Sequence, residues 1–409
     1  MKNNDIVVII LGSASNALGQ VRCAHDAGYK CINLVPKTPN RFSAKSRYCR
    51  GYVTPDPYKN GKECLDFLKK IISSLPTKPY LFFSDDEWMM LVGDHEQEIK
   101  EIAHIIQTPW DELVKLYDKK LLYRIAAEND IPHPKTKEIE TLKDIKNALA
   151  ELQFPCIVKP QLTVNQNDIA SKNVKALHRT QKFNTFEDAV SWADNLLANT
   201  IDFPVVIQEF IPGDATNLYT LTSYSDVEGN LVAGSIGYKL RQFPPAAGRI
   251  TAGVLHYDDA LHNVGKEFLK KVKFHGIANT EFKYDARDGQ YKLMEINARF
   301  GAWNYSTLYS GINLMQIAIN DYNGVKYEGE PFKTDKDEHI WYNLLQDYGC
   351  SVILNKKEGF TDSVLTTKQW RKSLGKNHFE AIFDWKDPMP FIAYLFYTLK
   401  DYLKGKTAE

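Results

Sequence analysis

The chain has 409 residues, too many for one hydrophobic core, and this length indicates two or three domains. Hydrophobic residues make up 44% of the sequence and charged residues 25%, which is the balance of a folded rather than a disordered protein. The 51 Lys and Arg residues match 51 Asp and Glu residues, so a broad nucleic-acid-binding surface is not expected. A local positive pocket for a small phosphate ligand is compatible with this balance.

No stretch of the sequence approaches the roughly 20 apolar residues that a membrane-spanning helix needs. The apolar run near the start, residues 6–11, is too short for the core of a signal peptide, and we interpret it as a first strand. The 6 cysteines form no Cys-x-x-Cys pair and have no histidine partners at zinc spacing, which predicts reduced and mostly buried thiols. These features favour a cytoplasmic enzyme.

Strand and helix signals alternate over the first hundred residues. Residues 5–11 predict a strand, residues 12–28 a turn and a helix, residues 30–35 a second strand and residues 80–83 a later one. Short apolar strands separated by helices indicate a parallel sheet with right-handed crossovers. We therefore expect an open α/β domain at residues 1–107.

A second unit begins near Thr108, and we assign it residues 108–325. Thr108 is a good N-cap residue and Pro109 suits the first helical position, which predicts a single helix that ends at Asn129 before Pro132. Farther along lie two buried strands, near 154–160 and 204–213, with a helix between them at about 186–197. We expect these to form a lid subdomain at about 154–209.

From Leu218 onward the pattern changes to strand after strand. The predicted strands are 218–224, 231–240, 279–284 and 291–296. Such a run of antiparallel strands after an α/β domain predicts an α+β second domain. The remainder, 326–409, is rich in aromatic residues without a strong period, and we interpret it as a C-terminal appendage packed on the core.

The strongest group of polar residues lies in the last predicted hairpin. Strand alternation places Glu295, Asn297 and Arg299 on one face, and a five-residue connection at 286–290 places Glu281 opposite Glu295. Facing carboxylates are destabilising unless a cation lies between them, and carboxylate and amide oxygens suit Mg²⁺. The alternative is a solvated polar face.

Two lysines are candidates for binding phosphate. Lys159 ends a buried apolar run, where a lysine is costly unless an anion compensates its charge. Lys119 lies on a helix, and an ordinary exposed lysine is the alternative for it. Lys239 and Arg241 alternate on one strand before a Pro/Gly loop, so they either hold an acidic substrate group or form plain surface.

Two further segments offer polar groups at the ends of strands. After Gln208, the segment Glu209-Phe210-Ile211 leaves a buried strand, and a strand that leaves its sheet exposes the backbone donor and acceptor that an adenine edge needs. Asp85 and Asp86 follow the strand at 80–83. For each of these aspartates there are two interpretations: it pairs with a substrate ammonium group, or it caps a helix.

The order of these motifs along the chain resembles the ATP-grasp superfamily, over about residues 5–320. The shared motifs are a preceding α/β domain, Asp118-Lys119, Val158-Lys159-Pro160, Gln208-Glu209-Phe210, Glu281, and Glu295-Ile296-Asn297-Ala298-Arg299. Segments 238–245 and 383–391 look like a narrower branch of carboxylate–amine ligases. That branch is related to D-aspartate ligase and more remotely to biotin carboxylase.

The resemblance implies a role for each matching residue. The implied ATP-binding residues are Lys119, Lys159, Gln208, Glu209, Phe210, Ile211, Asp214 and Asn217. The implied ligands of one or two Mg²⁺ ions, with Mn²⁺ as an alternative, are Glu281, Glu295 and Asn297. Arg299 would stabilise the transferred phosphoryl group or the acyl phosphate, and Lys239 and Arg241 would hold the γ-phosphate or the substrate carboxylate.

One segment departs from the superfamily pattern. The loop over the phosphates usually carries glycine, whereas residues 161–180 contain none. Lys172 and Lys175 are possible substitutes for the phosphate contacts of that loop.

The motifs together predict an ATP-dependent ligase that forms an amide bond through an acyl phosphate, with an amino acid as a substrate and small-molecule carboxylate and amine partners. A homodimer is compatible with this prediction. Three alternatives stay open: a bicarbonate-activating carboxylase, a nucleotide-binding protein without turnover, and a membrane-associated ligase docked through Pro390 to Leu403.

Overall fold

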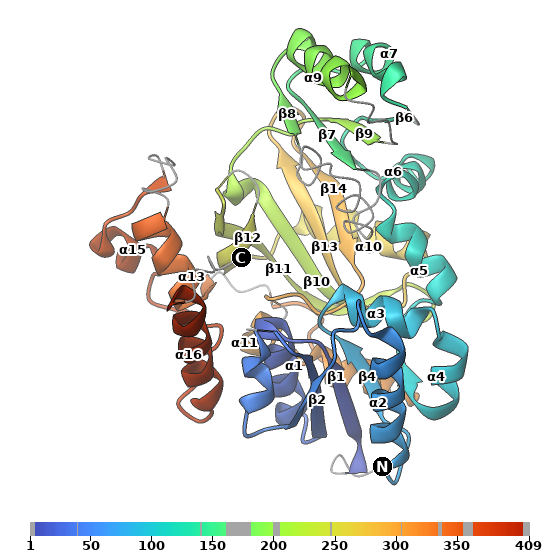
Figure 1. Ribbon diagram of the computed structural model, residues 1–409, viewed down its shortest axis with the longest axis vertical. Helices are drawn as coiled ribbons and strands as arrows, with labels where there is room; N and C mark the ends of the chain where they lie inside the picture. Colours follow the sequence, from blue (N-terminus) through green and yellow to red (C-terminus); the bar gives the residue numbers. More distant parts are fainter. Residues whose placement is uncertain are drawn as a thin grey trace.

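The computed structural model describes residues 5–38, 40–139, 141–160, 181–198, 205–245, 248–303, 305–333, 338–354 and 363–403, with the backbone alone at 159, 160 and 401–403. Three sheets organise these residues. Figure 1 shows the five-stranded sheet at the bottom, the seven-stranded sheet in the middle and the four-stranded sheet at the top. The mixed α/β and α+β architecture predicted from the sequence is confirmed.

The N-terminal sheet is entirely parallel, in the order β3-β2-β1-β4-β5. Its strands are β1 (Val7–Leu11), β2 (Lys30–Pro36), β3 (Arg50–Thr54), β4 (Tyr80–Phe83) and β5 (His104–Ile105). Its helices are α1 (Ala14–Asp26), the 3-10 turn η2 (Arg41–Lys45), α2 (Gly61–Ser73), α3 (Asp86–Gly93) and α4 (Glu96–Ile102). Every residue of β1 is buried, because helices cover both faces of such a sheet.

The turn after β1 requires a glycine. Gly12 has a φ of 123°, and a Cβ at this position would lie 2.1 Å from Oγ of Ser84. The ends of β1 and β4 therefore approach each other at the carboxyl edge of the sheet. This is the edge at which open α/β sheets bind ligands.

The central sheet has seven strands, in the order β14-β13-β10-β11-β12-β15-β16. The strands are β10 (Leu218–Ser225), β11 (Leu231–Phe243), β12 (Arg249–Leu255), β13 (Gly276–Asp285), β14 (Gln290–Asn297), β15 (His339–Tyr342) and β16 (His378–Glu380). Helix α10 (Asp259–Lys271) packs on one face, and α12 (Leu314–Tyr322) packs between the other face and α1. The N-terminal domain is thus joined to the central sheet through a shared core.

The four-stranded sheet has the order β6-β9-β7-β8. Its strands are β6 (Thr136–Ile139), β7 (Cys156–Pro160), β8 (Gln181–Phe183) and β9 (Val205–Glu209). The 3-10 turn η3 (Leu142–Asp144) and the helices α7 (Ile145–Ala150) and α9 (Phe186–Ala198) cover one face with an apolar core of their own. This unit begins earlier than the predicted lid, because β6 pairs with β9.

The helix predicted from Thr108 to Asn129 is two helices. These are α5 (Trp110–Tyr117) and α6 (Lys119–Glu128), and Asp118 between them has extended backbone angles of −76° and 113°. The Asp118 carboxylate accepts hydrogen bonds from the amides of Lys120 and Leu121, so it starts a new helix rather than continuing the old one. Thr108 does not cap α5; its hydroxyl accepts a hydrogen bond from the amide of His275.

The C-terminal segment is more than an appendage, because β15 and β16 extend the central sheet. The other elements of this segment are α13 (Leu344–Tyr348), the π-helical turn η6 (Gly349–Leu354), α15 (Thr367–Ser373) and α16 (Met389–Leu403). Two short elements lie before it, η5 (Ala215–Asn217) and α11 (Ser306–Tyr309). Among the described residues, no helix is both long enough and apolar enough to cross a membrane.

Candidate active site

The carboxylate pair predicted from the sequence lies on the β13–β14 hairpin. Glu281 stands directly opposite Glu295, and Asn279 stands opposite Asn297. Asp285 pairs with Gln290, so the connection is one residue shorter than predicted. The predicted pairing is nevertheless correct, because a β-bulge between Glu281 and Phe282 restores the register.

The bulge is held by a residue from another element. It leaves Met294 without a partner on β13, since Phe282 pairs with Leu293. The hydroxyl of Tyr123, on α6, donates a hydrogen bond of 2.8 Å to the carbonyl of Met294. Helix α6 therefore stabilises the irregularity that brings the two glutamates together.

Lys239 supplies a cation to the carboxylate pair. Its Nζ lies 3.3 Å from Oε2 of Glu281, and the side chain of Glu281 is only 20% exposed. Burial raises the pKa of Glu281 and the charge of Glu295 raises it further, while Lys239 opposes both effects. The pair is thus a place where negative charge is crowded and an added cation is stabilising.

Arg299 lies beyond the end of β14 and links the hairpin to the N-terminal domain. Its Nε and Nη2 donate to the two oxygens of Asp86 at 2.6 and 2.7 Å, and Nη2 is 3.4 Å from Oδ1 of Asn297. Burial by itself would lower the pKa of Arg299, and the bond to Asp86 raises it above its ordinary value. Of the two acids that follow β4, Asp85 caps α3 and Asp86 holds the guanidinium.

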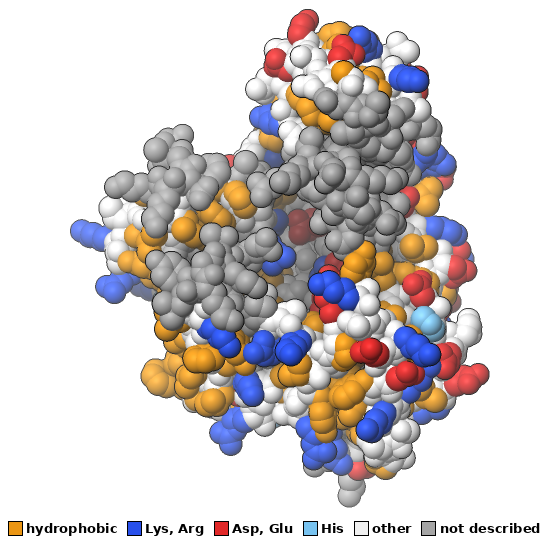
Figure 2. Space-filling view, viewed as in Figure 1, with side chains coloured by type: hydrophobic (Ala, Val, Ile, Leu, Met, Phe, Trp, Pro, Cys, Tyr) orange, Lys and Arg blue, Asp and Glu red, His pale blue; other side chains and the backbone are white. Residues whose placement is uncertain are grey.

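The contacts form a chain across the site. Asn297 donates from Nδ2 to Oε1 of Glu295 at 3.2 Å and accepts from Arg299. The group therefore contains three carboxylates, those of Asp86, Glu281 and Glu295, and two cations, Lys239 and Arg299. Figure 2 shows acidic and basic side chains in a recess near the centre of the face in view.

The donor set fits a divalent cation. The excess carboxylate charge and the amide oxygen are hard ligands, and Mg²⁺ commonly binds one or two carboxylates while its other positions take substrate phosphates. Within the described part of the chain, no group of three or more His, Cys, Asp or Glu side chains is placed to hold a metal. A metal on this hairpin would therefore rest on the two glutamates and Asn297 and would leave positions open to a ligand.

Arg241 lies apart from the carboxylate pair, in contrast to its predicted partnership with Lys239. Its Nε donates to Oδ1 of Asp347 at 2.9 Å and its Nη2 to Oδ2 at 2.7 Å, and Nη1 donates to Ser373. The regular alternation fails because β11 is bulged on both sides of Arg241. The two cations therefore serve different carboxylates.

The predicted adenine segment lies where the four-stranded sheet meets the central sheet. The amide of Glu209 donates to the carbonyl of Lys135, and the amide of Phe210 donates to the carbonyl of Pro155. The Glu209 carboxylate accepts from the amide of Lys135 at 2.9 Å and lies 3.4 Å from Arg287. These two backbone amides are therefore engaged within the fold rather than exposed.

The neighbouring predicted residues have structural partners as well. Gln208 is fully buried and donates to Oγ1 of Thr136 at 3.0 Å. The Asp214 carboxylate accepts from the amide of Thr216, at the start of the short turn that contains Asn217. Ile211 is buried.

Lys283 is a residue that the sequence analysis missed. Its Nζ lies 4.8 Å from the ring centre of Phe210 and donates to the carbonyl of Gly213 at 3.1 Å, and Lys182 approaches the same ring at 4.0 Å. Burial lowers the pKa of Lys283 to about 8, and the charge of Lys182 adds to this shift. The sequence feature that could have identified Lys283 is its position two residues after Glu281 on the same strand.

The two predicted phosphate lysines are placed only in part. Lys119 is the first residue of α6 and is half-buried. The backbone of Lys159 pairs with Val206 within the four-stranded sheet. The side chain of Lys159 and the whole of the loop 161–180, with Lys172 and Lys175, lie outside the described residues.

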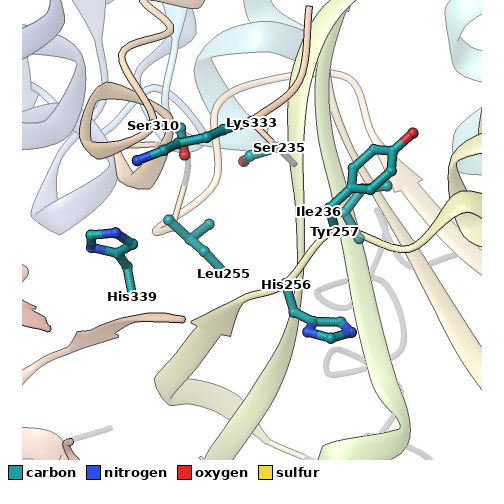
Figure 3. Close-up of a pocket in the computed structure, with 8 residues that line it drawn as sticks. All are labelled: Ser235, Ile236, Leu255, His256, Tyr257, Ser310, Lys333 and His339. Atoms are coloured by element: carbon teal, nitrogen blue, oxygen red, sulfur yellow. The ribbon is translucent and has the colours of Figure 1, made fainter. Parts of the chain in front are cut away.

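A small pocket lies elsewhere on the central sheet. Figure 3 shows its lining, which consists of Ser235, Ile236, Leu255, His256, Tyr257, Ser310, Lys333 and His339. Ser235 is four residues from Lys239 on β11, a separation of roughly 13 Å at about 3.3 Å per strand residue. The pocket contains none of the predicted site residues.

The chain is similar in sequence to known proteins. Residues 239–342, which include Lys239 and the carboxylate hairpin, match the family model described as ATP-grasp in the biosynthetic pathway with Ter operon. The chain is 26% identical to D-aspartate ligase of Enterococcus faecium over 329 residues. The aligned region covers 78% of this chain and 77% of that protein. By these matches the chain is an ATP-dependent ligase that is similar to ATP-grasp ligases.

Two further proteins are similar to this ligase. Alanine–anticapsin ligase of Bacillus subtilis is 28% identical over 184 residues, which span 42% of this chain and 38% of that protein. An L-amino acid ligase from Bacillus licheniformis has a similar fold, with a TM-score of 0.57, 16% identity, and coverage of 78% of this chain and 74% of that one.

A further solved structure carries a nucleotide. N5-carboxyaminoimidazole synthetase from Staphylococcus aureus, complexed with ADP, aligns with a TM-score of 0.62 at 13% identity and covers 87% of each chain. These structural likenesses extend the shared fold through the N-terminal domain of the ligase and its central sheet.

Proposed function

We propose that this ligase joins a carboxylate to an amine in an amide bond, with ATP as the energy source and an amino acid as one substrate. The observation that carries the proposal is the Glu281–Glu295 pair, set between Lys239 and Arg299. This arrangement provides cations and metal ligands but no obvious proton-transfer base, which suits phosphoryl transfer to a carboxylate. The names of the relatives, D-aspartate ligase and alanine–anticapsin ligase, support an amino-acid substrate.

The proposed reaction has two steps. A carboxylate oxygen of the acid attacks the γ-phosphorus of ATP, the bond from that phosphorus to the β,γ-bridging oxygen breaks, and ADP leaves. The amine nitrogen then attacks the acyl carbon, the bond from that carbon to the phosphate oxygen breaks, and phosphate leaves while the nitrogen loses a proton. Lys239 and Arg299 stabilise the negative charge that develops on the transferred group.

We further propose that Glu281, Glu295 and Asn297 hold one or two Mg²⁺ ions, which neutralise phosphate charge. Lys119 and Lys159 are assigned to the phosphates, Gln208, Glu209, Phe210 and Ile211 to the adenine segment, and Asp214 or Asn217 to the ribose. Arg241 is not carried into this set, since its guanidinium is committed to Asp347. We place the reaction in the cytoplasm, with small-molecule acid and amine substrates.

The test is ADP release over a panel of amino-acid pairs, with mass spectrometry of the products. The expected result is ADP formation that requires both an acid and an amine, with a product lighter by one water than the two substrates combined. An acid labelled with ¹⁸O in its carboxylate is expected to pass one labelled oxygen to phosphate. ADP release that depends on bicarbonate alone would establish the carboxylase instead, and no nucleotide turnover with any pair would contradict the ligase.

A further inference from the structure

The outward face of α16 carries a continuous row of exposed apolar side chains. We define the outer stripe as Trp385, Met389, Ile392, Phe396 and Leu399. These side chains are, in that order, 86%, 50%, 52%, 60% and 58% exposed. Their spacing of four, three, four and three residues places them on one side of the helix and of the turn before it. A row of this kind on a protein surface marks an interaction site.

The opposite face of the same helix already has its partner. Phe391, Tyr394 and Tyr397 pack into the core between α16 and the central sheet, and the ring of Tyr394 lies 5.0 Å from that of Phe42 on η2. The helix is thus held in place without the outer stripe. Packing within the described chain does not explain why the face that carries the outer stripe is apolar.

Basic residues border the outer stripe. The sequence has no Asp or Glu between Asp26 and Asp56. In this acid-free segment, Arg41 lies 4.4 Å from the ring centre of Tyr397 and Arg47 donates from Nη1 to the carbonyl of Lys386, so both are fastened to α16 and its preceding turn.

Further cations lie close by. The exposed residues Lys45, Lys386 and Lys400 belong to η2, to the turn before α16 and to α16 itself. Asp387 is 1% exposed and is bonded to Ser46 and to the amide of Arg47, and Asp384 accepts from the amide of Lys386. Figure 2 shows hydrophobic side chains at the lower left, in the region of α16 in Figure 1, with Lys and Arg side chains beside them.

From this geometry we propose that the outer stripe and its basic border dock the protein on an anionic lipid bilayer. An exposed apolar stripe on a helix, with cations close by, is the arrangement of helices that lie in the membrane interface. The helix has 15 residues, a length of about 22 Å at 1.5 Å per residue, so it is too short to span the bilayer and would lie along its surface. A second copy of the chain is a poorer occupant, since a two-fold contact would bring the same basic borders together.

The test is flotation of the full-length chain with vesicles. We expect the protein to float with phosphatidylcholine vesicles that contain about 30% phosphatidylglycerol and to remain largely unbound to phosphatidylcholine alone. Raising the salt from about 0.1 M to about 1 M is expected to weaken binding, because it screens the basic border. The double variant Ile392→Ser/Phe396→Ser is expected to reduce partition by at least about tenfold, since it removes the two most central apolar contacts.

The matched control is Val227→Ser/Val325→Ser, which changes two similarly exposed apolar residues, 68% and 56% exposed, outside α16. It is expected to bind as the wild type does, and circular dichroism checks that both variants are folded. Absence of wild-type flotation with the anionic vesicles, or equal binding by the two double variants, would overturn the proposal. A wild-type dimer that does not float, and that the stripe variant converts to a monomer, would show a self-interface instead.

Discussion

Arg241 on β11 and Arg299 just beyond β14 each bind an aspartate through Nε and Nη2, yet their surroundings differ. Arg241 bonds Asp347 of the C-terminal segment, and the Asp347 side chain is fully buried. Arg299 bonds Asp86 of the N-terminal domain, and the Asp86 side chain is 38% exposed. The two arginine side chains are equally exposed, at 15%. We call the first pair sealed and the second open, because only the aspartate of the second reaches solvent.

The partners of each aspartate explain what this difference means. Asp347 also accepts hydrogen bonds from Oγ1 of Thr251 and Nε1 of Trp370, so its oxygens are saturated by the protein. Arg299 instead reaches Asn297, which bonds Glu295 and leads to the carboxylate pair. The same chemical pair thus holds the C-terminal segment in one place and, in the other, holds Arg299 beside Asn297 and the carboxylate pair.

The largest expected effect is on ADP formation, and it tests the carboxylate pair to which Arg299 is linked through Asn297. Glu295→Gln removes one of the facing charges, and we expect the rate of ADP formation to fall by about 10²- to 10³-fold, because the proposed Mg²⁺ binding and phosphoryl transfer both use that carboxylate. The measurement is ADP release with the best amino-acid pair. Glu228→Gln, on the exposed turn between β10 and β11, is the matched control and should behave as the wild type. Equal rates for the two variants would contradict the site.

Asp347→Asn tests the sealed pair. The change removes the fully buried carboxylate that neutralises Arg241, whose side chain is only 15% exposed, so we expect the free energy of unfolding to fall by about 3 kcal/mol. Urea denaturation followed by circular dichroism measures it. Asp66→Asn, at an exposed position of α2, should shift the midpoint little. Equal free energies of unfolding for the two variants would show that the buried carboxylate of Asp347 contributes little to stability.

Asp86→Asn is the counterpart at the open pair. Because the Asp86 side chain is 38% exposed, we expect a stability change within about 1 kcal/mol, and about a tenfold loss of kcat from poorer orientation of Arg299. KM for ATP should stay nearly unchanged. Glu87→Gln, at the next and exposed position, serves as the control. A stability loss as large as that of Asp347→Asn would erase the distinction between the two pairs.

The smallest effect concerns Asp85, the residue that caps α3. Burial raises its pKa to about 7, with Glu87 adding to the shift, whereas an unfolded aspartate titrates near about 3.9. The native carboxyl holds its proton more tightly, so its contribution to stability is complete below the unfolded pKa and is lost as pH rises through the native pKa. Asp85→Asn keeps a good cap and removes this titration.

We therefore expect the unfolding free energy of the wild type, relative to Asp85→Asn, to fall by about 1 to 2 kcal/mol between pH 5 and pH 8. Urea denaturation of both proteins at the two pH values measures this difference. A constant difference across that range would mean that Asp85 titrates normally in the folded protein.

Predictions from the sequence succeeded where the interaction was local. The glutamate pair lies within one hairpin, so strand alternation placed Glu281 opposite Glu295 even though the turn and the bulge were both missed. The single helix predicted after Thr108 was wrong, because the periodicity continues across Asp118 while the side chain of Asp118 caps a new helix.

The two arginine pairs show where such reasoning ends. Arg241 and Asp347 are 106 residues apart, and Arg299 and Asp86 are 213 residues apart. The sequence alone indicated the parallel N-terminal sheet, the antiparallel strands and the ATP-grasp motifs, because periodicity and turn residues act over a few neighbouring positions. Only the tertiary structure decided which aspartate each arginine binds and which face of α16 packs against the described core, since distant segments meet according to the packing of the whole chain.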